Sequence, residues 1–300
     1  MGQEDSLSSG RRRFRWRHIF WILVGAMVVL WVGKAVLPDL VSMGKERVAV
    51  VRIEGPILDS QQAVTDLEDF SEDPLVKAIV VRIDSPGGGV APSQEIYNAV
   101  RRVREEHNKI IVASMGTVAA SGGYYIAVAS DRILANPGTL TGSIGVILQV
   151  ANIEELLKKI GVQSLVIKSG RYKDLGSPFR PMTQEDRRLM QAVMDDVHKQ
   201  FIEAVARGRS LEVADVELLA DGRVFTGLQA KDSLLVDDLG DLRDAIRLAG
   251  NLGGIKGEPP VVEPTRRFSI RDLISSYLFG EMPSLALQTT WMPLMYLMVI

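Results

Sequence analysis

The chain has 300 residues, a formal net charge of −2 and no cysteine. Its 35 basic and 37 acidic residues nearly cancel, so it lacks the overall positive charge typical of nucleic-acid-binding proteins, and we expect no nucleic-acid partner. The absence of cysteine excludes disulfides, thiol nucleophiles and cysteine-ligated metal ions. The length suffices for one large domain or two small ones.

The N-terminal region combines a basic cluster with an apolar run. Five arginines lie between residues 11 and 17, and an uncharged run from Ile19 to Gly33 follows them. If Lys34 extends its amine to the interface, the span reaches the roughly 20 residues that a transmembrane helix needs. Arginines next to a span favour the cytoplasmic side. We therefore predict a cytoplasmic segment at 1–17, a membrane anchor at 18–38 and the remainder of the chain outside the cytoplasm.

A cleaved signal peptide is the alternative for this region. Gly33 and Ala35 form a weak pair of small residues of the kind that precedes a cleavage site. The residue between them is a lysine, and the apolar run is long for a signal peptide. We favour the anchor.

Apolar runs and helical periodicities alternate along the middle of the chain, which predicts an α/β fold with parallel, right-handed βαβ units. The predicted strands are Val48–Ile53, Val76–Ile83, Lys109–Ser114, Asp131–Ala135, Ile144–Val150 and Val162–Ile167. The predicted helices are Ser60–Phe70, Ala91–Glu106, a helix after Ser121, Ile153–Ile160, Thr183–Arg207 and one that ends at Ala249.

The C-terminal part, 253–300, is predicted to be a linker and an apolar tail. Three prolines and three glycines between Gly253 and Pro264 indicate the linker. The apolar end, Trp291–Ile300, is too short to span a bilayer. It fits either an oligomer core or a contact with the membrane surface, and the sequence does not separate the two.

Two glycine-rich turns suggest acyl-transfer chemistry. Ser121 lies in a turn of small residues between an apolar strand and a helix, and Gly122 follows it directly. A second turn, Asp84–Gly89, contains three consecutive glycines. Glycine lets the main chain approach a substrate closely, so the N–H groups of Gly88 and Gly122 are candidates for an oxyanion hole.

A serine nucleophile needs a base, and the three histidines of the chain fit that role poorly. His18 lies at the predicted membrane edge, whereas His107 and His198 lie in charged segments. A lysine can replace histidine if it is neutral, which burial in apolar surroundings favours. Lys173 is the best candidate because glycines bracket its loop and apolar segments surround it.

These motifs resemble the bacterial signal peptide peptidase A family in its short, single-repeat form. The resemblance covers roughly Val48 to Ala249. It rests on the segments Arg82–Val90, Met115–Tyr125, Ala135–Val146, Lys168–Asp174 and Gly222–Ala230. It implies a Clp-protease/crotonase-like spiral of ββα units over a peptidase domain at 45–252.

The same resemblance implies the roles of five residues. Ser121 would be the nucleophile, Lys173 the general base, and Gly88 and Gly122 the oxyanion donors. Ser143 would orient the lysine amine. The family also implies a homo-octamer on the outer face of the plasma (inner) membrane, with serine and lysine from adjacent subunits in each site.

The expected substrates are residual signal peptides or other unfolded hydrophobic peptides, and no cofactor or metal ion is expected. Three alternatives are a related stomatin-cleaving membrane peptidase, a crotonase-like enzyme acting on acyl-CoA, and an inactive membrane scaffold.

Overall fold

The computed structural model describes residues 27, 44–264 and 295–297. The chain divides into two units, 1–45 and 46–300, and nearly all described residues belong to the second. The predicted cytoplasmic segment and membrane anchor therefore lie outside the described residues, apart from Met27. Among the helices that are described, none is both long and apolar enough to cross a membrane.

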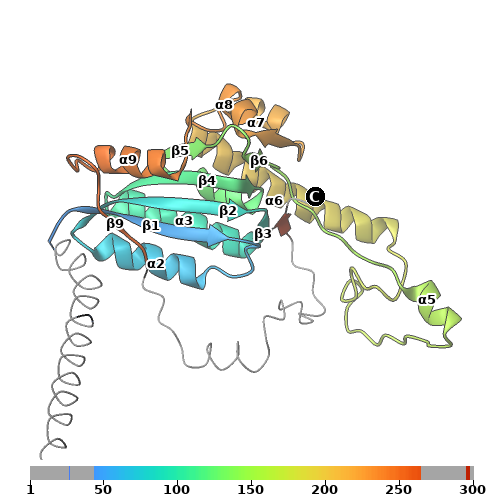
Figure 1. Cartoon of the computed structure of the whole chain (residues 1–300). Helices are drawn as coiled ribbons and strands as arrows, with labels where there is room; N and C mark the ends of the chain where they lie inside the picture. The colour runs from blue at the N-terminus through green and yellow to red at the C-terminus, as the bar shows by residue number, and fades with distance from the viewer. Residues whose placement is uncertain (1–26, 28–43, 265–294, 298–300) are drawn as a thin grey trace, which may run out of the picture. The chain divides into compact units, whose positions relative to one another are not determined.

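The second unit is built on a sheet of eight strands in which parallel pairing dominates (Figure 1). The strands are β1 (Arg47–Glu54), β2 (Val76–Ser85), β4 (Ile110–Ala120), β5 (Arg132–Ala135), β6 (Leu140–Gly142), β7 (Val224–Thr226), β8 (Asp238–Leu239) and β9 (Val261–Val262). The main path runs β7-β6-β4-β2-β1-β9, and the β6–β7 pair is antiparallel. The sheet confirms the predicted α/β class.

Helices cover both faces of this sheet, because its central strands are apolar on both sides. On β1, Ala49 and Val51 belong to the larger core, whereas Val48 and Val50 belong to a smaller one on the other face. The larger core packs against α2 (Gln61–Glu72), α3 (Val90–Glu106), α4 (Gly122–Ala127) and α6 (Gln184–Arg209). The smaller core packs against α9 (Leu242–Leu252), which Figure 1 shows on the opposite side of the sheet from α2 and α3.

Strand β4 divides the sheet into two branches. Its residues 112–114 pair with β5, and its residues 118–120 pair with β6, in both cases in parallel. The sequence analysis ended this strand at Ser114, six residues before its end at Ala120. The extension matters because it carries the chain to Ser121, beside the end of β6.

The predicted strands at 144–150 and 162–167 are wrong, since the structure has no named strand in either range. A strand needs a hydrogen-bonded neighbour, and no described segment pairs with 162–167. The side chains of Leu165 and Ile167 are 88% and 93% exposed. Apolar character alone suggested a buried strand there, but nothing in the described part of the chain buries it.

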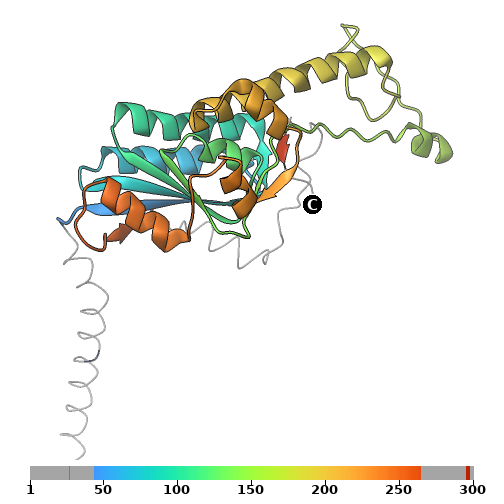
Figure 2. The same ribbon diagram turned by 90° about the horizontal axis from the view of Figure 1, so that it is seen from above.

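Residues 151–183 form an arm that contains the short helix α5 (Glu154–Lys159) and ends at the start of α6 (Figure 2). No residue from 151 to 185 is buried. The predicted cap of α6 is confirmed: the Thr183 side chain accepts from the Asp186 N–H, and the Asp186 carboxylate accepts from the Thr183 N–H. After α6, the helices α7 (Val213–Leu219) and α8 (Gly227–Asp232) lead back to the sheet.

Candidate active site

Ser121 occupies a strained turn between β4 and α4. Its φ is +53° and its ψ is −117°, although a non-glycine residue rarely adopts positive φ. The residue is 1% exposed, and its Oγ has no hydrogen-bond partner in the described part of the chain. Nucleophilic serines at strand-to-helix turns have this geometry, in which strain holds the hydroxyl in a fixed direction.

This turn at Ser121, which we call the elbow, is held by backbone hydrogen bonds and by the packing of α4. The Ser121 N–H donates to the Gly142 oxygen at 2.8 Å, and the Tyr125 N–H donates to the Ser121 oxygen at 2.8 Å. The Tyr125 ring lies edge-on to Phe201 of α6, with ring centroids 5.0 Å apart. The Tyr124 hydroxyl donates to the Leu235 oxygen at 2.8 Å, and burial raises the pKa of Tyr124, so it remains a neutral donor.

The two glycine-rich turns meet at this elbow. A Cβ atom on Gly122 would lie 3.3 Å from the Gly88 nitrogen and 2.5 Å from Ser93 Oγ. A Cβ atom on Gly88 would lie 2.1 Å from the Ile57 oxygen, so no larger residue fits without a backbone shift. The absence of a side chain thus lets Gly122 approach the main chain of Gly88, and lets Gly88 approach that of Ile57.

Strand β3 (Gly87–Gly89) has two edges with different partners. On one edge the Ile57 N–H donates to the Gly87 oxygen at 2.9 Å, and the Gly89 N–H donates to the Ile57 oxygen at 2.8 Å. On the other edge lies β10 (Met295–Leu297), which pairs antiparallel with Gly88 opposite Tyr296. Alternate residues of a strand point their N–H groups to opposite edges, so the Gly88 N–H faces β10.

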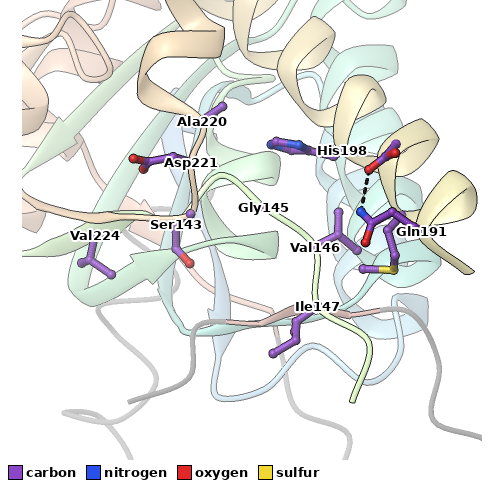
Figure 3. A pocket seen from close by; sticks show the side chains of 12 residues that line it. Ser143, Gly145, Val146, Ile147, Gln191, His198, Ala220, Asp221 and Val224 are labelled. Atoms are coloured by element: carbon purple, nitrogen blue, oxygen red, sulfur yellow. Dashed lines mark hydrogen bonds between the residues drawn. The ribbon is translucent and has the colours of Figure 1, made fainter. Parts of the chain in front are cut away.

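Ser143 lies directly after β6, and its φ of +50° is also positive. Its N–H donates to the Arg223 oxygen at 2.9 Å. The residue lines a cavity of about 410 Å³ between the chain after β6, α6 and the turn before β7 (Figure 3). On the α6 side, Gln191 donates to Asp195 at 2.7 Å, the dashed contact in Figure 3.

His198 also lines this cavity, which the sequence analysis did not expect. Its Nε2 atom is buried without a hydrogen-bond partner among the described residues. The charged residues around His198 in the sequence suggested that its side chain is exposed. A helical period places it on the same face as Ile202 and Val205, which are both buried, and that spacing was the available signal.

The structure does not bring Lys173 to Ser121. Lys173 lies on the exposed arm, and its amine has no hydrogen-bond or ion-pair partner in the described part of the chain. Ser121, Gly122 and Gly88 are adjacent, and Ser143 follows the neighbouring strand. Where the residues are described, no group of acidic or histidine side chains is arranged to hold a metal ion.

The site geometry accords with the comparisons with known proteins. The model of peptidase family S49 matches residues 103–256, about half of the chain, and that of the Clp protease matches residues 47–140. A putative protease of Synechocystis is 45% identical over 73% of this chain and 78% of its own length. This chain belongs to peptidase family S49.

Two further S49 relatives carry more specific names. A putative signal peptide peptidase SppA of Enterococcus faecium is 39% identical over 62% of this chain and 54% of its own. Protease 4 of Salmonella typhi is 36% identical over 70% of this chain, but that match spans only 35% of the relative. The predicted membership of the signal peptide peptidase A family is confirmed, and the chain is a serine peptidase. The Clp-protease match agrees with the parallel-rich sheet.

Proposed function

We propose that this S49 peptidase is anchored in the plasma (inner) membrane by residues 18–38 and hydrolyses residual signal peptides or other unfolded hydrophobic peptides outside the cytoplasm. Ser121 is its nucleophile and Lys173 its general base. The observation that carries the proposal is the buried, unpartnered Ser121 hydroxyl beside the two glycine turns. The stomatin-cleaving peptidase shares this chemistry, whereas the acyl-CoA enzyme and the inactive scaffold explain the strained serine less well.

In the reaction, Ser121 Oγ attacks the scissile carbonyl carbon while the neutral amine of Lys173 takes the hydroxyl proton. The carbonyl oxygen becomes an oxyanion that accepts from the N–H groups of Gly88 and Gly122. Each such donor is worth about 10²- to 10³-fold in rate. The lysine then gives its proton to the leaving amine, and the C–N bond breaks. Water, deprotonated by the same lysine, hydrolyses the acyl-enzyme.

The edge of β3 that faces β10 supports binding of an extended peptide. In this chain that edge already pairs with an antiparallel segment, β10, over Gly87–Gly89. A substrate strand in the same place would present its backbone carbonyls to the Gly88 N–H. Main-chain pairing of this kind recognises unfolded peptides with little regard for their sequence.

The exposed arm supports a site completed by a second copy of the chain. Lys173 is unpaired on the arm, and the apolar side chains of Leu165 and Ile167 beside it are almost fully exposed. Apolar surface of this kind is typical of subunit interfaces. We propose that the arm of one subunit packs on its neighbour in a homo-octamer. Lys173 then reaches Ser121 of that neighbour, and Ser143 orients its amine.

One set of variants tests the nucleophile, the base and the shared site together. A fluorophosphonate probe should label the wild type but not Ser121→Ala, because only an activated serine reacts. Ser121→Ala and Lys173→Ala should each abolish peptide cleavage, whereas His198→Ala should keep it. Mixing the two inactive variants should restore part of the activity. Loss of activity in His198→Ala with an active Lys173→Ala would overturn the assignment of the base.

A further inference from the structure

The loop that carries Lys173 is held by ionic contacts rather than by an apolar core. No residue from 151 to 185 is buried, and Asp186 is the first buried residue after the loop. The backbone of the loop forms successive turns: the Lys173 N–H donates to the Gly170 oxygen at 3.2 Å, and the Leu175 N–H donates to the Tyr172 oxygen at 3.1 Å. Such turns alone hold a loop weakly, so its polar contacts set its shape.

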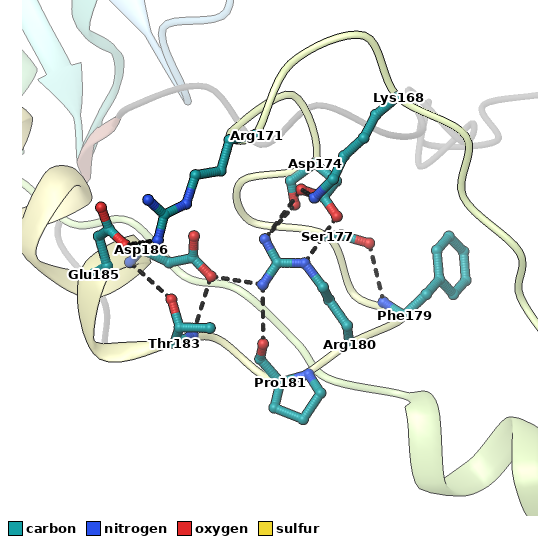
Figure 4. Close-up of polar contacts among 10 residues, drawn as sticks. All are labelled: Lys168, Arg171, Asp174, Ser177, Phe179, Arg180, Pro181, Thr183, Glu185 and Asp186. Atoms are coloured by element: carbon teal, nitrogen blue, oxygen red, sulfur yellow. Dashed lines mark hydrogen bonds and ion pairs between the residues drawn. The ribbon is translucent and has the colours of Figure 1, made fainter.

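Arg180 is the centre of these contacts (Figure 4). Its Nε and Nη2 donate to the two carboxylate oxygens of Asp174 at 2.9 and 3.1 Å, and Nη2 also donates to the Asp174 backbone oxygen at 3.3 Å. Its Nη1 donates to the Pro181 oxygen at 3.1 Å and to Asp186 Oδ2 at 2.5 Å. The five N–H donors of the guanidinium thus match five acceptors.

These contacts connect the residue after Lys173 to the start of α6. Asp186 Oδ2, which accepts from Arg180, also accepts from the Thr183 N–H at 3.0 Å in the capping box. Exposed ion pairs contribute little to stability. The two ion pairs of Arg180 differ from these, because the Asp174 and Asp186 side chains are only 10% and 5% exposed. In addition, the guanidinium binds the Asp174 carboxylate in a bidentate manner.

The same contacts occupy the carboxylate nearest to Lys173 in the sequence. Lys168 Nζ also contacts Asp174 Oδ1, at 2.6 Å, so both oxygens of Asp174 have cationic partners. The hydrogen bonds from Arg180 and then from Lys168 hold the pKa of Asp174 well below its usual range, so this carboxylate stays charged. An unpaired carboxylate there would favour the protonated form of any amine that it reached, Lys173 included, and a protonated amine cannot act as a base.

We propose that Arg180 is a positioning residue for Lys173: it fixes the turn at Asp174 and keeps that carboxylate from pairing with the catalytic amine. This inference rests on the proposed role of Lys173 as the base. The charged or titratable groups in contact within this loop and the first turn of α6 are Lys168, Arg171, Tyr172, Asp174, Arg180, Glu185 and Asp186. Of these, Arg171 provides a matched control, because it pairs with Glu185 on the exposed surface.

The test compares Arg180→Ala with Arg171→Ala in the full chain, by kcat and KM across pH. Arg180→Ala should lower kcat about 10- to 100-fold, with little change in KM, because the base is misplaced and the substrate site is not. Its activity should also require higher pH than that of the wild type. Arg171→Ala removes the same charge near Lys173 and should stay within about twofold of the wild type at every pH.

A second change separates the two parts of the inference. Arg180→Ala frees Asp174 Oδ2, whereas Lys168 still contacts Oδ1. Asp174→Asn, added to Arg180→Ala, removes the carboxylate charge and should return the pH profile to that of the wild type while kcat stays low. If Arg180→Ala proves unfolded, Arg180→Lys takes its place; one ammonium cannot span the five acceptors, so the same shift is expected in smaller degree.

The outcomes distinguish this inference from the proposed function. If Lys173→Ala is inactive while Arg180→Ala has the kcat and pH profile of Arg171→Ala, the positioning role of Arg180 is refuted. The assignment of Lys173 as the general base is then still supported. A pH shift that persists in the double variant refutes the carboxylate explanation. If Lys173→Ala is active, the proposed base itself fails, whatever Arg180 does.

Discussion

Ser121 and Ser143 lie one residue beyond the last paired residues of two adjacent parallel strands, and both have positive φ. The Ser121 N–H donates to the oxygen of Gly142, the residue before Ser143. Because Ala120 pairs with Gly142, the two serines leave the sheet at the same level. The register of β4 and β6 therefore positions the nucleophile relative to the hydroxyl proposed to orient its base.

The two serines should differ in what their loss costs. Ser121→Ala should remove all detectable peptidase activity, since no other hydroxyl can form the acyl-enzyme. Ser143→Ala should lower kcat by about 10- to 100-fold, because the lysine amine loses an acceptor but stays in reach. Ser130→Ala is the control, since Ser130 is also buried with an unpartnered Oγ but lies outside the site. Its activity should equal that of the wild type; a Ser130→Ala variant as inactive as Ser121→Ala would contradict the assignment.

The close approach of α4 to α3 at Gly122 can be tested by a pair of substitutions. Gly122→Ala should lower activity at least about 10-fold, since its Cβ would lie 2.5 Å from Ser93 Oγ and displace the oxyanion donors. Adding Ser93→Ala removes that atom and should restore part of the activity, although the bond from Ser93 Oγ to the Gly89 oxygen is lost. Gly138→Ala, where a Cβ would meet nothing within 4 Å, is the control. A double variant no better than Gly122→Ala would show that the collision is not the cause.

Strand β10 pairs with the edge of β3 at which we propose that substrates bind, so its removal should favour substrate binding. A chain ending at Pro264 should have a lower KM for unfolded peptides than the full chain. A synthetic Trp291–Ile300 peptide should inhibit this shortened chain competitively. The same peptide with an N-methyl group at Tyr296 lacks the donor opposite Gly88 and should inhibit far less. Equal inhibition by both peptides would mean that the tail does not act through strand pairing.

Asp237 gives a prediction for stability against pH. Burial of its carboxylate disfavours ionisation, but hydrogen bonds from Arg209 at 2.9 and 3.1 Å and from the Ile133 N–H at 2.7 Å outweigh it and lower the pKa of Asp237. Because the pKa of Asp237 is lower in the folded state, its ionisation stabilises the fold at pH values above the unfolded-state pKa of about 3.9. This stabilisation is lost as the pH falls through the folded-state pKa. Asp237→Asn should therefore cost about 1–3 kcal/mol in the free energy of unfolding at pH 7, and less below pH 4.

The exposed neighbour Asp238 provides the control for this measurement. Its carboxylate pairs with Lys231 on the surface. Asp238→Asn should leave the free energy of unfolding close to that of the wild type at both pH values, because solvent screens an exposed ion pair. Denaturant unfolding at pH 7 and pH 3 compares the two variants, and equal costs for both would refute the role given to the buried pair.

The central sheet and the elbow were predictable because their signals are local. Apolar runs of strand length gave β1 and β2, and the small residues around Ser121 gave the turn. The misassigned range 162–167 shows the limit: its apolar pattern was interpreted as a buried strand, but no segment among the described residues pairs with it or buries it. His198 was missed because charged residues surround it in the sequence, and that pattern was interpreted as an exposed segment. The separation of Ser121 and Lys173 within one chain could not follow from either pattern, since it depends on where the arm at 151–183 lies relative to the sheet.

Because β10 pairs with β3, the tail of the chain and a substrate would compete for the same edge of β3. Because both strands belong to the same chain, dilution does not release β10 as it would release a separate inhibitor. The edge is open only in the fraction of molecules whose tail has left it, and the measured affinity for a peptide is lowered by that fraction. If substrates bind at this edge as proposed, the tail raises the apparent KM for every peptide by the same factor, and activity falls in proportion to substrate concentration.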